Sequence, residues 1–142
     1  MITLQVRNGD LVVGPKGHAV VEGRAKVIQD LGLALREPLG IDRFHPEQGS
    51  MLHRYIGEPV GVETESLVRA EIYRIVRNVM AIQQETLTKD SNQGARPRFT
   101  TSEVIASIDG VDIVQEFDRY HVRVRLRMLS GEEIQQVVTV QR

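Results

Sequence analysis

Histidines are the first candidates for chemistry in this chain, because imidazole binds metals and transfers protons near neutral pH. The chain has four of them, at His18, His45, His53 and His121. No two have the four-residue spacing that places a pair of imidazoles on one helix face with a glutamate between them. His45 and His53 flank Glu47, and the three could share a metal only if the loop folds back. We therefore expect loop and surface histidines, no metal site and no cofactor.

Paired carboxylates could cleave a glycosidic bond if one acid lay in an apolar pocket and the other at a fixed distance. Glu37, Asp42 and Glu47 fall within one loop, but nothing in the sequence singles out a pair. Ser50 lacks the two flanking glycines of a nucleophile elbow, and the segment 14–17 is too short for a phosphate-binding loop. The sequence thus offers no catalytic residue, and we expect that the protein is not an enzyme.

Three arginines alternate along one segment, at Arg123, Arg125 and Arg127. On a strand this spacing places three guanidinium groups on one face, roughly 7 Å apart at ~3.4 Å per residue. One interpretation is a solvated face with acids on the neighbouring strand, such as Asp112 or Glu116. The other is a docking surface for an acidic partner or for protein assembly, since arginine is favoured at interfaces. The sequence leaves both open.

Composition limits the class of protein. The chain has 142 residues, no cysteine, and a net charge of −1 from 18 basic and 19 acidic residues. That length favours a single domain over residues 1–142. A chain that holds phosphate backbones is usually basic, so we expect no nucleic acid partner. No apolar run approaches the ~18 residues of a membrane span, and no secretory signal is visible. We therefore expect an intracellular soluble protein with no membrane partner.

The first third of the chain predicts short strands and one helix. Leu4 and Val6 alternate with polar neighbours, a turn at residues 8–9 tolerates positive φ, and an apolar run returns at 11–13, so this pattern predicts a hairpin. A second turn at 14–17 and a short strand at 19–21 follow. Apolar residues then recur at helical spacing over 23–36, before a proline and a glycine. We see no internal repeat.

A loop at 37–49 contains several turn-forming residues. Its apolar side chains, Leu39, Ile41 and Phe44, predict an ordered loop, because they need an apolar environment. Its glycines and prolines separate the first helix from the next one.

The middle of the chain predicts further helices. A short one covers 51–56, and a long one runs from its capping residue Thr64 to about residue 87. A polar connector follows at 89–94, and a last short helix is expected at 103–108.

The last third predicts an antiparallel meander. Alternating apolar residues mark strands at 111–117, 120–128 and 133–141. Each strand has one apolar face, so the sheet needs a cover, and the long central helix is the obvious one. The expected fold is α+β: an N-terminal β-hairpin and helices packed on a C-terminal β-meander.

The order of these motifs resembles the baseplate wedge and sheath-initiator family of contractile phage tails. The family's central signature is a glycine, an acid, an arginine, a proline, then a glycine and a small residue. This chain matches that signature loop at Gly40, Asp42, Arg43, Pro46, Gly49 and Ser50. It departs from the family in having Gln48 where an aromatic is usual, and an extra residue, Ile41, after the first glycine.

The family's second signature is Glu-Pro-Arg after the long helix. Here the matching residues are Arg96, Pro97 and Arg98, so an arginine stands where the family has glutamate. The resemblance implies that this segment contacts the wedge proteins. The departure at Arg96 puts in doubt any charge pairing that the family's glutamate makes.

The resemblance implies a structural role in the baseplate of a virion tail, assembled in the host cytoplasm. Six copies would surround the tail tube or hub, bind the wedge proteins, and present a sheet to which arms of the sheath protein add strands. The same role would hold in tail-like injection systems. The sequence also leaves open a small cell-wall glycosidase, which the family's old lysozyme-like label suggests, and a free-standing peptide-binding adaptor.

An exposed strand edge could receive the sheath arm through its unpaired N–H and C=O groups. The last strand has no proline or lysine to block pairing, so we expect it to be the sheath-docking edge. Its residues are Ile134, Gln135, Gln136, Val137, Val138, Thr139 and Val140. The strand at 111–117 is the alternative edge.

Overall fold

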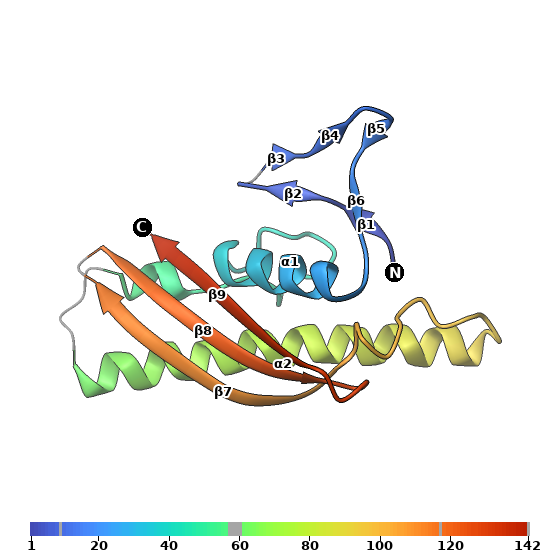
Figure 1. Cartoon of the computed structure of the whole chain (residues 1–142). Coiled ribbons are helices and arrows are strands. Elements are labelled where there is room, and N and C mark those ends of the chain that lie inside the picture. The colour runs from blue at the N-terminus through green and yellow to red at the C-terminus, as the bar shows by residue number, and fades with distance from the viewer. Residues whose placement is uncertain (9, 57–60, 117, 142) are drawn as a thin grey trace.

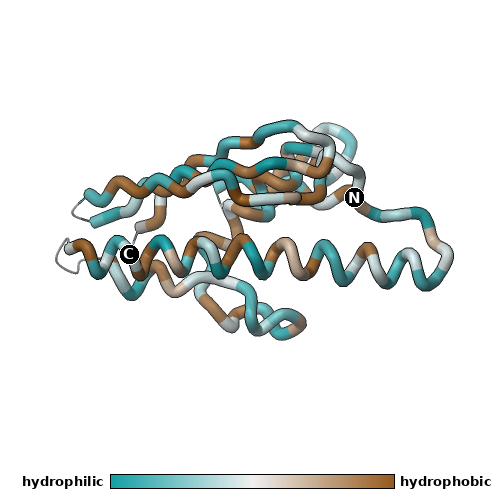
Figure 2. The backbone as a smooth tube through the Cα atoms, turned by 90° about the horizontal axis from the view of Figure 1, so that it is seen from below, coloured by the Kyte–Doolittle hydropathy of each residue, from teal (hydrophilic) through white to brown (hydrophobic). Residues whose placement is uncertain are grey.

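The computed structural model describes residues 1–8, 10–56, 61–116 and 118–141, and it shows the predicted α+β fold (Figure 1). Short N-terminal strands lead into two helices, and a three-stranded antiparallel sheet follows. The long helix α2, Val62–Asn92, runs along the length of the molecule, as Figure 2 also shows. Within these described ranges, no helix is long and apolar enough to cross a membrane.

The N-terminal strands form three two-residue ladders: β1 (Thr3–Leu4) pairs with β6 (Val20–Val21), β2 (Val6–Arg7) with β3 (Asp10–Leu11), and β4 (Val13–Gly14) with β5 (Gly17–His18). The main-chain N–H of Gln5 donates to Ala19 O at 2.8 Å, that of Ala19 to Val12 O at 2.8 Å, and that of Val12 to Gln5 O at 2.9 Å. These three positions are seven residues apart along the chain. We call this unit, which consists of β1 to β6, the N-terminal triangle.

The predicted hairpin is present in this unit as the β2–β3 pair, with Val6 opposite Leu11. Asn8 has φ of 54°, as the expected turn requires. The pairing stops after two residues because Gln5 and Val12 bond across the centre of the triangle. The hairpin is therefore interrupted, and the strand at residue 19 closes the triangle.

Helix α1 spans Gly23–Arg36 and confirms the predicted range. Its stripe at Val27, Leu31 and Leu35 is buried in the core. The helix ends at Glu37, whose N–H donates to Leu33 O. The next residue is a proline, which disfavours a helical backbone in the residue before it.

Helix α2 is longer at both ends than predicted. It begins after Gly61 instead of at the expected cap Thr64, and it ends at Asn92. The helix continues past residue 87 because Asp90, which is 3% exposed, turns inward and is bonded by Arg98 from the returning chain. The predicted connector at 89–94 is therefore helical over most of its length.

The short helix predicted at 103–108 is wrong, because strand β7, Ile105–Glu116, begins inside it. Val104 and Ile105 are buried. The side chain of Gln83 in α2 donates to Glu103 O at 2.8 Å and accepts from Ile105 N–H at 3.0 Å. These tertiary contacts hold the chain extended where local sequence favoured a helix.

The short helix predicted at 51–56 is reduced to the 3-10 turn η1, Leu52–Arg54. Leu52 is fully buried. The hydroxyl of Tyr120 in the sheet donates to Tyr55 O at 2.9 Å, so this turn is attached to the helix side of the sheet.

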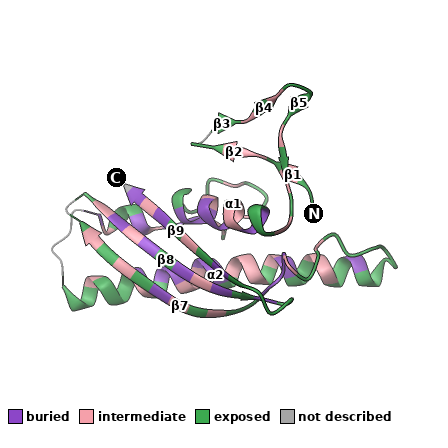
Figure 3. Cartoon of the chain, viewed as in Figure 1, coloured by how far each residue is buried: buried purple, intermediate pink, exposed green. Residues whose placement is uncertain are grey.

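The sheet order is β7–β8–β9, with β8, Arg119–Met128, in the centre and β9, Glu133–Gln141, at one side. One face is buried against the helices along alternate positions of β8 (Figure 3). Helix α2 packs mainly on β7 and α1 on β9. The core therefore lies between one sheet and two helices, and the opposite sheet face is open.

Candidate functional site

The sheet has two outer strands whose peptide groups on the side away from β8 could pair with a partner. Glu116 and Arg119 are opposite each other across a two-residue connection, which makes them a hydrogen-bonded pair. Successive residues of a strand direct their peptide groups to opposite sides. When this alternation is followed across β8, the peptide groups of Gln135, Val137 and Thr139 in β9 face away from β8.

One contact in β9 agrees with this assignment. The side-chain amide of Gln136 donates to Val137 O at 3.3 Å, so this carbonyl is reached from the free side of the strand. The predicted docking edge thus divides into two sets. Ile134, Val138 and Val140 are buried, while Gln135 and Val137 are exposed. The residues of β9 between its two ends are uncharged, so the strand itself places no charged guard along this edge.

The other outer strand, β7, is guarded. Arg69 of α2 donates to Val111 O, which the same alternation places on the free side of β7. Arg69 is itself held by Glu65 at 2.8 Å, one helical turn earlier. The ladder also has irregular register between Ile105 and Ser107 and again further along β7. Bulges and inserted charges both oppose strand addition, so β9 is the more open edge.

The three alternating arginines lie on the open sheet face. Arg127 pairs with Asp109 at 2.7 Å, and Arg125 approaches Asp112 at 3.7 Å. This geometry favours the interpretation as a solvated face with acids on the neighbouring strand. Arg123 makes no ion pair within the described part of the chain.

The signature loop is built around two backbone constraints. Asp42 Oδ1 accepts from Phe44 N–H at 2.8 Å, forming a tight side-chain turn. Gly49 has φ of +98°, and a Cβ there would lie 2.6 Å from Pro38 O. That position requires glycine, because it brings Ser50 alongside Pro38 in a parallel bridge.

Helix α2 anchors this loop through polar side chains that the sequence analysis did not single out. Arg74 donates to Glu47 O at 3.1 Å and to Gly49 O at 2.8 Å. Glu71, 5% exposed, accepts from Met51 N–H and pairs with Arg74 at 2.6 Å. Burial alone would raise the Glu71 pKa, but the Arg74 and Met51 donors outweigh it and lower that pKa. An acid and an arginine three residues apart on the helix were the only sequence signal.

The apolar tip of the loop is exposed, which contradicts the expectation that its side chains are buried. Phe44 is 90% exposed and Ile41 64%. Arg43 of the signature lies beside them and is also exposed. The turn at Asp42 directs these residues outward. The loop is held in place by hydrogen bonds from the Arg74 side chain of α2 to its main-chain carbonyls, and not by contacts of its own apolar side chains.

The segment 96–98 returns along the end of α2. Arg98 Nη2 lies 2.8 Å from Asp90 Oδ1, and its main-chain N–H donates to the same carboxylate at 3.0 Å. The hydrogen bonds from Arg98 lower the pKa of Asp90. Arg96 and Pro97 are exposed, and Arg96 makes no ion pair within the described ranges. Arg98 therefore has a fold contact, and Arg96 is the free cation of the segment.

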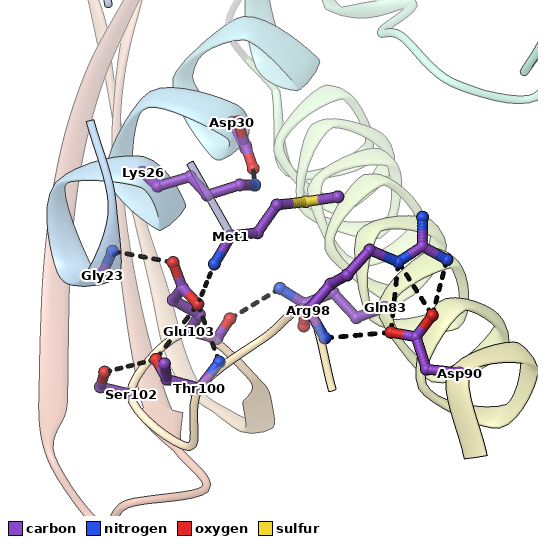
Figure 4. A network of polar contacts seen from close by, with 10 residues as sticks. All are labelled: Met1, Gly23, Lys26, Asp30, Gln83, Asp90, Arg98, Thr100, Ser102 and Glu103. Atoms are coloured by element: carbon purple, nitrogen blue, oxygen red, sulfur yellow. Dashed lines mark hydrogen bonds and ion pairs between the residues drawn. The ribbon is translucent and has the colours of Figure 1, made fainter. Parts of the chain in front are cut away.

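Glu103 joins three separate segments (Figure 4). Its carboxylate is 1% exposed and accepts at 2.8 Å from the Met1 amine, from Gly23 N–H and from Thr100 N–H. Burial raises the pKa of this carboxyl, but these donors outweigh burial and lower it to about 2. The contact ties the N-terminal triangle and the start of α1 to the turn before β7.

The Glu103 carboxylate predicts a pH dependence of stability. Its pKa in the folded chain, about 2, is below the ordinary 4.5. The ionised form therefore stabilises the fold above pH ~5, and this contribution of about 3 kcal/mol disappears as the pH falls toward 2. Chemical denaturation between pH 7 and pH 2.5 should show that loss, and Glu103→Gln should remove most of it. Substitution of the exposed Glu132 by glutamine is the control. If Glu103→Gln loses as much stability between pH 7 and pH 2.5 as the unsubstituted protein does, the assignment is wrong.

The acids considered for glycoside cleavage do not converge on one pocket. Asp42 is engaged in its own turn, and Glu47 is exposed near His45 Nδ1 at 3.5 Å. Glu37 lines a pocket between α1 and α2. In the described part of the chain, no group of three His, Asp or Glu side chains could hold a metal ion.

The arrangement is thus one open strand edge, one guarded edge, and two anchored loops that present exposed arginines. Comparison of the chain with protein-family models, curated proteins and solved structures gives no match.

Proposed function

We propose that the protein is a structural component of a contractile-tail baseplate, which joins the wedge proteins to the tail tube and starts sheath assembly by strand addition. The observation that carries this proposal is the outer edge of β9, where the peptide groups of Gln135, Val137 and Thr139 face away from β8 and can receive a partner strand. A partner strand there would extend the sheet through main-chain hydrogen bonds. The guard on β7 from Arg69 supports β9 as the receiving edge.

The two anchored loops support the proposed wedge contacts. Arg96 and Pro97 are exposed beyond the end of α2, and Arg98 keeps half of its side chain exposed while it holds Asp90. Arg43 and Phe44 form a second exposed point on the signature loop. Both loops are fixed from α2 by buried acids, so they can present arginines to acidic partners with little ordering cost. In this proposal, six copies of the protein surround the tail tube.

Tail assembly without this chain tests the proposal. Tails assembled in its absence should contain the tube but lack sheath, and adding the purified chain during assembly should restore sheathed tails counted by electron microscopy. Normal sheath on tails that lack the chain would contradict a role in initiation. The same purified protein should not release fragments from peptidoglycan. Release that Glu37→Gln, Asp42→Asn or Glu47→Gln abolishes would replace the proposal with the glycosidase.

A further inference from the structure

The helix layer of this protein is wider than the sheet it covers. Two packed helices span about 20 Å, since each is about 10 Å across, whereas three strands at ~4.8 Å span about 14 Å. Helix α2 lies mainly against β7 and α1 against β9. By these dimensions the helix layer exceeds the sheet by about one strand. Figure 1 shows α1 on the side of β9 that is away from β8.

A groove of about 310 Å³ occupies this place. Its floor is a stripe of α1 that includes Ala25, Ile28 and Gly32. Gln136 of β9 lines one wall, and Val6 of the N-terminal triangle lines the opposite wall. The groove therefore adjoins the outer edge of β9, where no further strand of the described chain pairs.

Gly32 leaves space above the floor of the groove because it has no side chain. It is buried in mid-helix, and a Cβ added there would meet only the Gln136 side-chain amide, at 3.9 Å. Glycine costs about 1 kcal/mol of helix propensity relative to alanine, so its place in α1 is not explained by the helix itself. Gln136 Nε2 bonds Val137 O at 3.3 Å, a long contact that an incoming main-chain donor can replace.

The far wall is also fixed. Gln29 of α1 donates to Leu4 O at 2.8 Å and accepts from Val6 N–H at 2.8 Å, so its amide pairs with the triangle as a neighbouring strand would. This side chain fixes the triangle to α1 on the far side of the groove from β9. An extended chain fits a space about one strand wide, whereas a helix about 10 Å across does not.

Among the described residues that line the groove, Arg36 alone has a charged side chain, and it makes no ion pair with another described residue. Arg24 pairs with Glu132 at the start of β9, and Gly32 lies beside Gln136, so α1 and β9 run in the same direction. Arg36, one turn after Gly32, therefore lies toward the carboxyl end of β9.

We propose that this groove seats a fourth strand, an extended arm of the sheath subunit that pairs with Gln135, Val137 and Thr139 and carries a carboxylate opposite Arg36. This inference rests on the proposed function and adds the chemistry of the arm. Small or aliphatic side chains of the arm face α1 over Gly32, and its acid meets Arg36. The main chain provides most of the affinity, and the acid fixes how far the strand slides along β9.

Two strand-length peptides of alternating threonine and valine test this, one with glutamate at both ends and one with lysine at both ends. Fluorescence anisotropy with the full chain should show that the glutamate peptide binds more tightly, by about fivefold for an exposed pair. Arg36→Glu should reverse the preference. Arg77→Glu, an exposed arginine on α2 outside the groove, should leave it unchanged. Equal affinities, or no binding of either peptide at millimolar concentration, would overturn the proposed seat.

Two further variants separate this inference from the proposed function. Gly32→Leu should weaken both peptides by filling the floor, whereas Gly32→Ala should keep binding, with circular dichroism checking the fold of each. If Gly32→Leu does not fold, the reversal by Arg36→Glu still decides. Val137→Pro should abolish binding of both peptides. Loss of binding in Val137→Pro without any effect of Arg36→Glu would reject the groove and keep strand addition at β9.

Discussion

Val137→Pro should fold normally and yet lower the fraction of sheathed tails about tenfold or more. The Val137 N–H faces away from β8, so proline removes no hydrogen bond of the folded chain. It does remove a donor worth about 1 kcal/mol to an incoming strand, and its ring would crowd that strand. Tails assembled with the variant would be counted for sheath by electron microscopy, after circular dichroism has confirmed the fold.

Neighbouring variants serve as controls for this result. Val138→Pro removes an N–H that faces β8, so it should destabilise the protein instead. Val137→Thr keeps the N–H and should start sheath almost normally, and Arg125→Ala on the open face should matter less than the proline. Normal sheath with folded Val137→Pro would exclude β9 as the docking edge and leave the β7 strand as the candidate.

Gly49→Ala should cost about 3 kcal/mol of stability, a fall of roughly 10 °C in Tm for a chain of this size. The alanine Cβ would lie 2.6 Å from Pro38 O and 2.8 Å from Leu39 Cα, and both are main-chain atoms that cannot move alone. The φ of +98° adds strain to any side chain. A backbone shift that relieved this crowding would pull Gly49 O away from Arg74 and loosen the signature loop.

Two other glycines separate crowding from strain. Gly94 has φ of +63° with no atom within 4 Å of an added Cβ, so Gly94→Ala should lose only about 1 kcal/mol. Gly61→Ala meets neither problem and should lose well under ~1 kcal/mol, through the poorer N-cap that alanine gives to α2. Thermal unfolding of the three variants should rank Gly49 as the most sensitive. A Gly49→Ala protein as stable as Gly61→Ala would show that the loop does not depend on this close approach.

The sequence predicted those elements whose boundaries are determined by residues close by in the chain. Helix α1 matched over 23–36 because its apolar stripe ends at a proline. Strand β8 matched because its side chains alternate between the core and solvent. The helix predicted at 103–108 failed because Gln83, twenty residues earlier, captures the backbone there. Contacts of that range leave no periodic signal in the sequence.

The candidate site was predicted in the same uneven way. The open edge at 134–140 followed from the absence of proline and lysine in the last strand, and its burial pattern agrees with the expected alternation. The guard at Arg69 could not be predicted, because its carbonyl partner Val111 lies in a different element. The exposed Phe44 was misjudged, since hydrophobicity alone says nothing of a loop that is anchored by its backbone.

The N-terminal triangle also governs how this part of the chain folds and opens. Its central amides, Gln5, Val12 and Ala19, bond in a closed ring, so the ring cannot close before residue 19 is in place. All its internal contacts are nonetheless local in sequence, which allows it to form quickly. Breaking one bond of the ring removes the support of the other two. The three amides therefore exchange with solvent together, as one small cooperative unit tied to the body by Gln29 and Glu103.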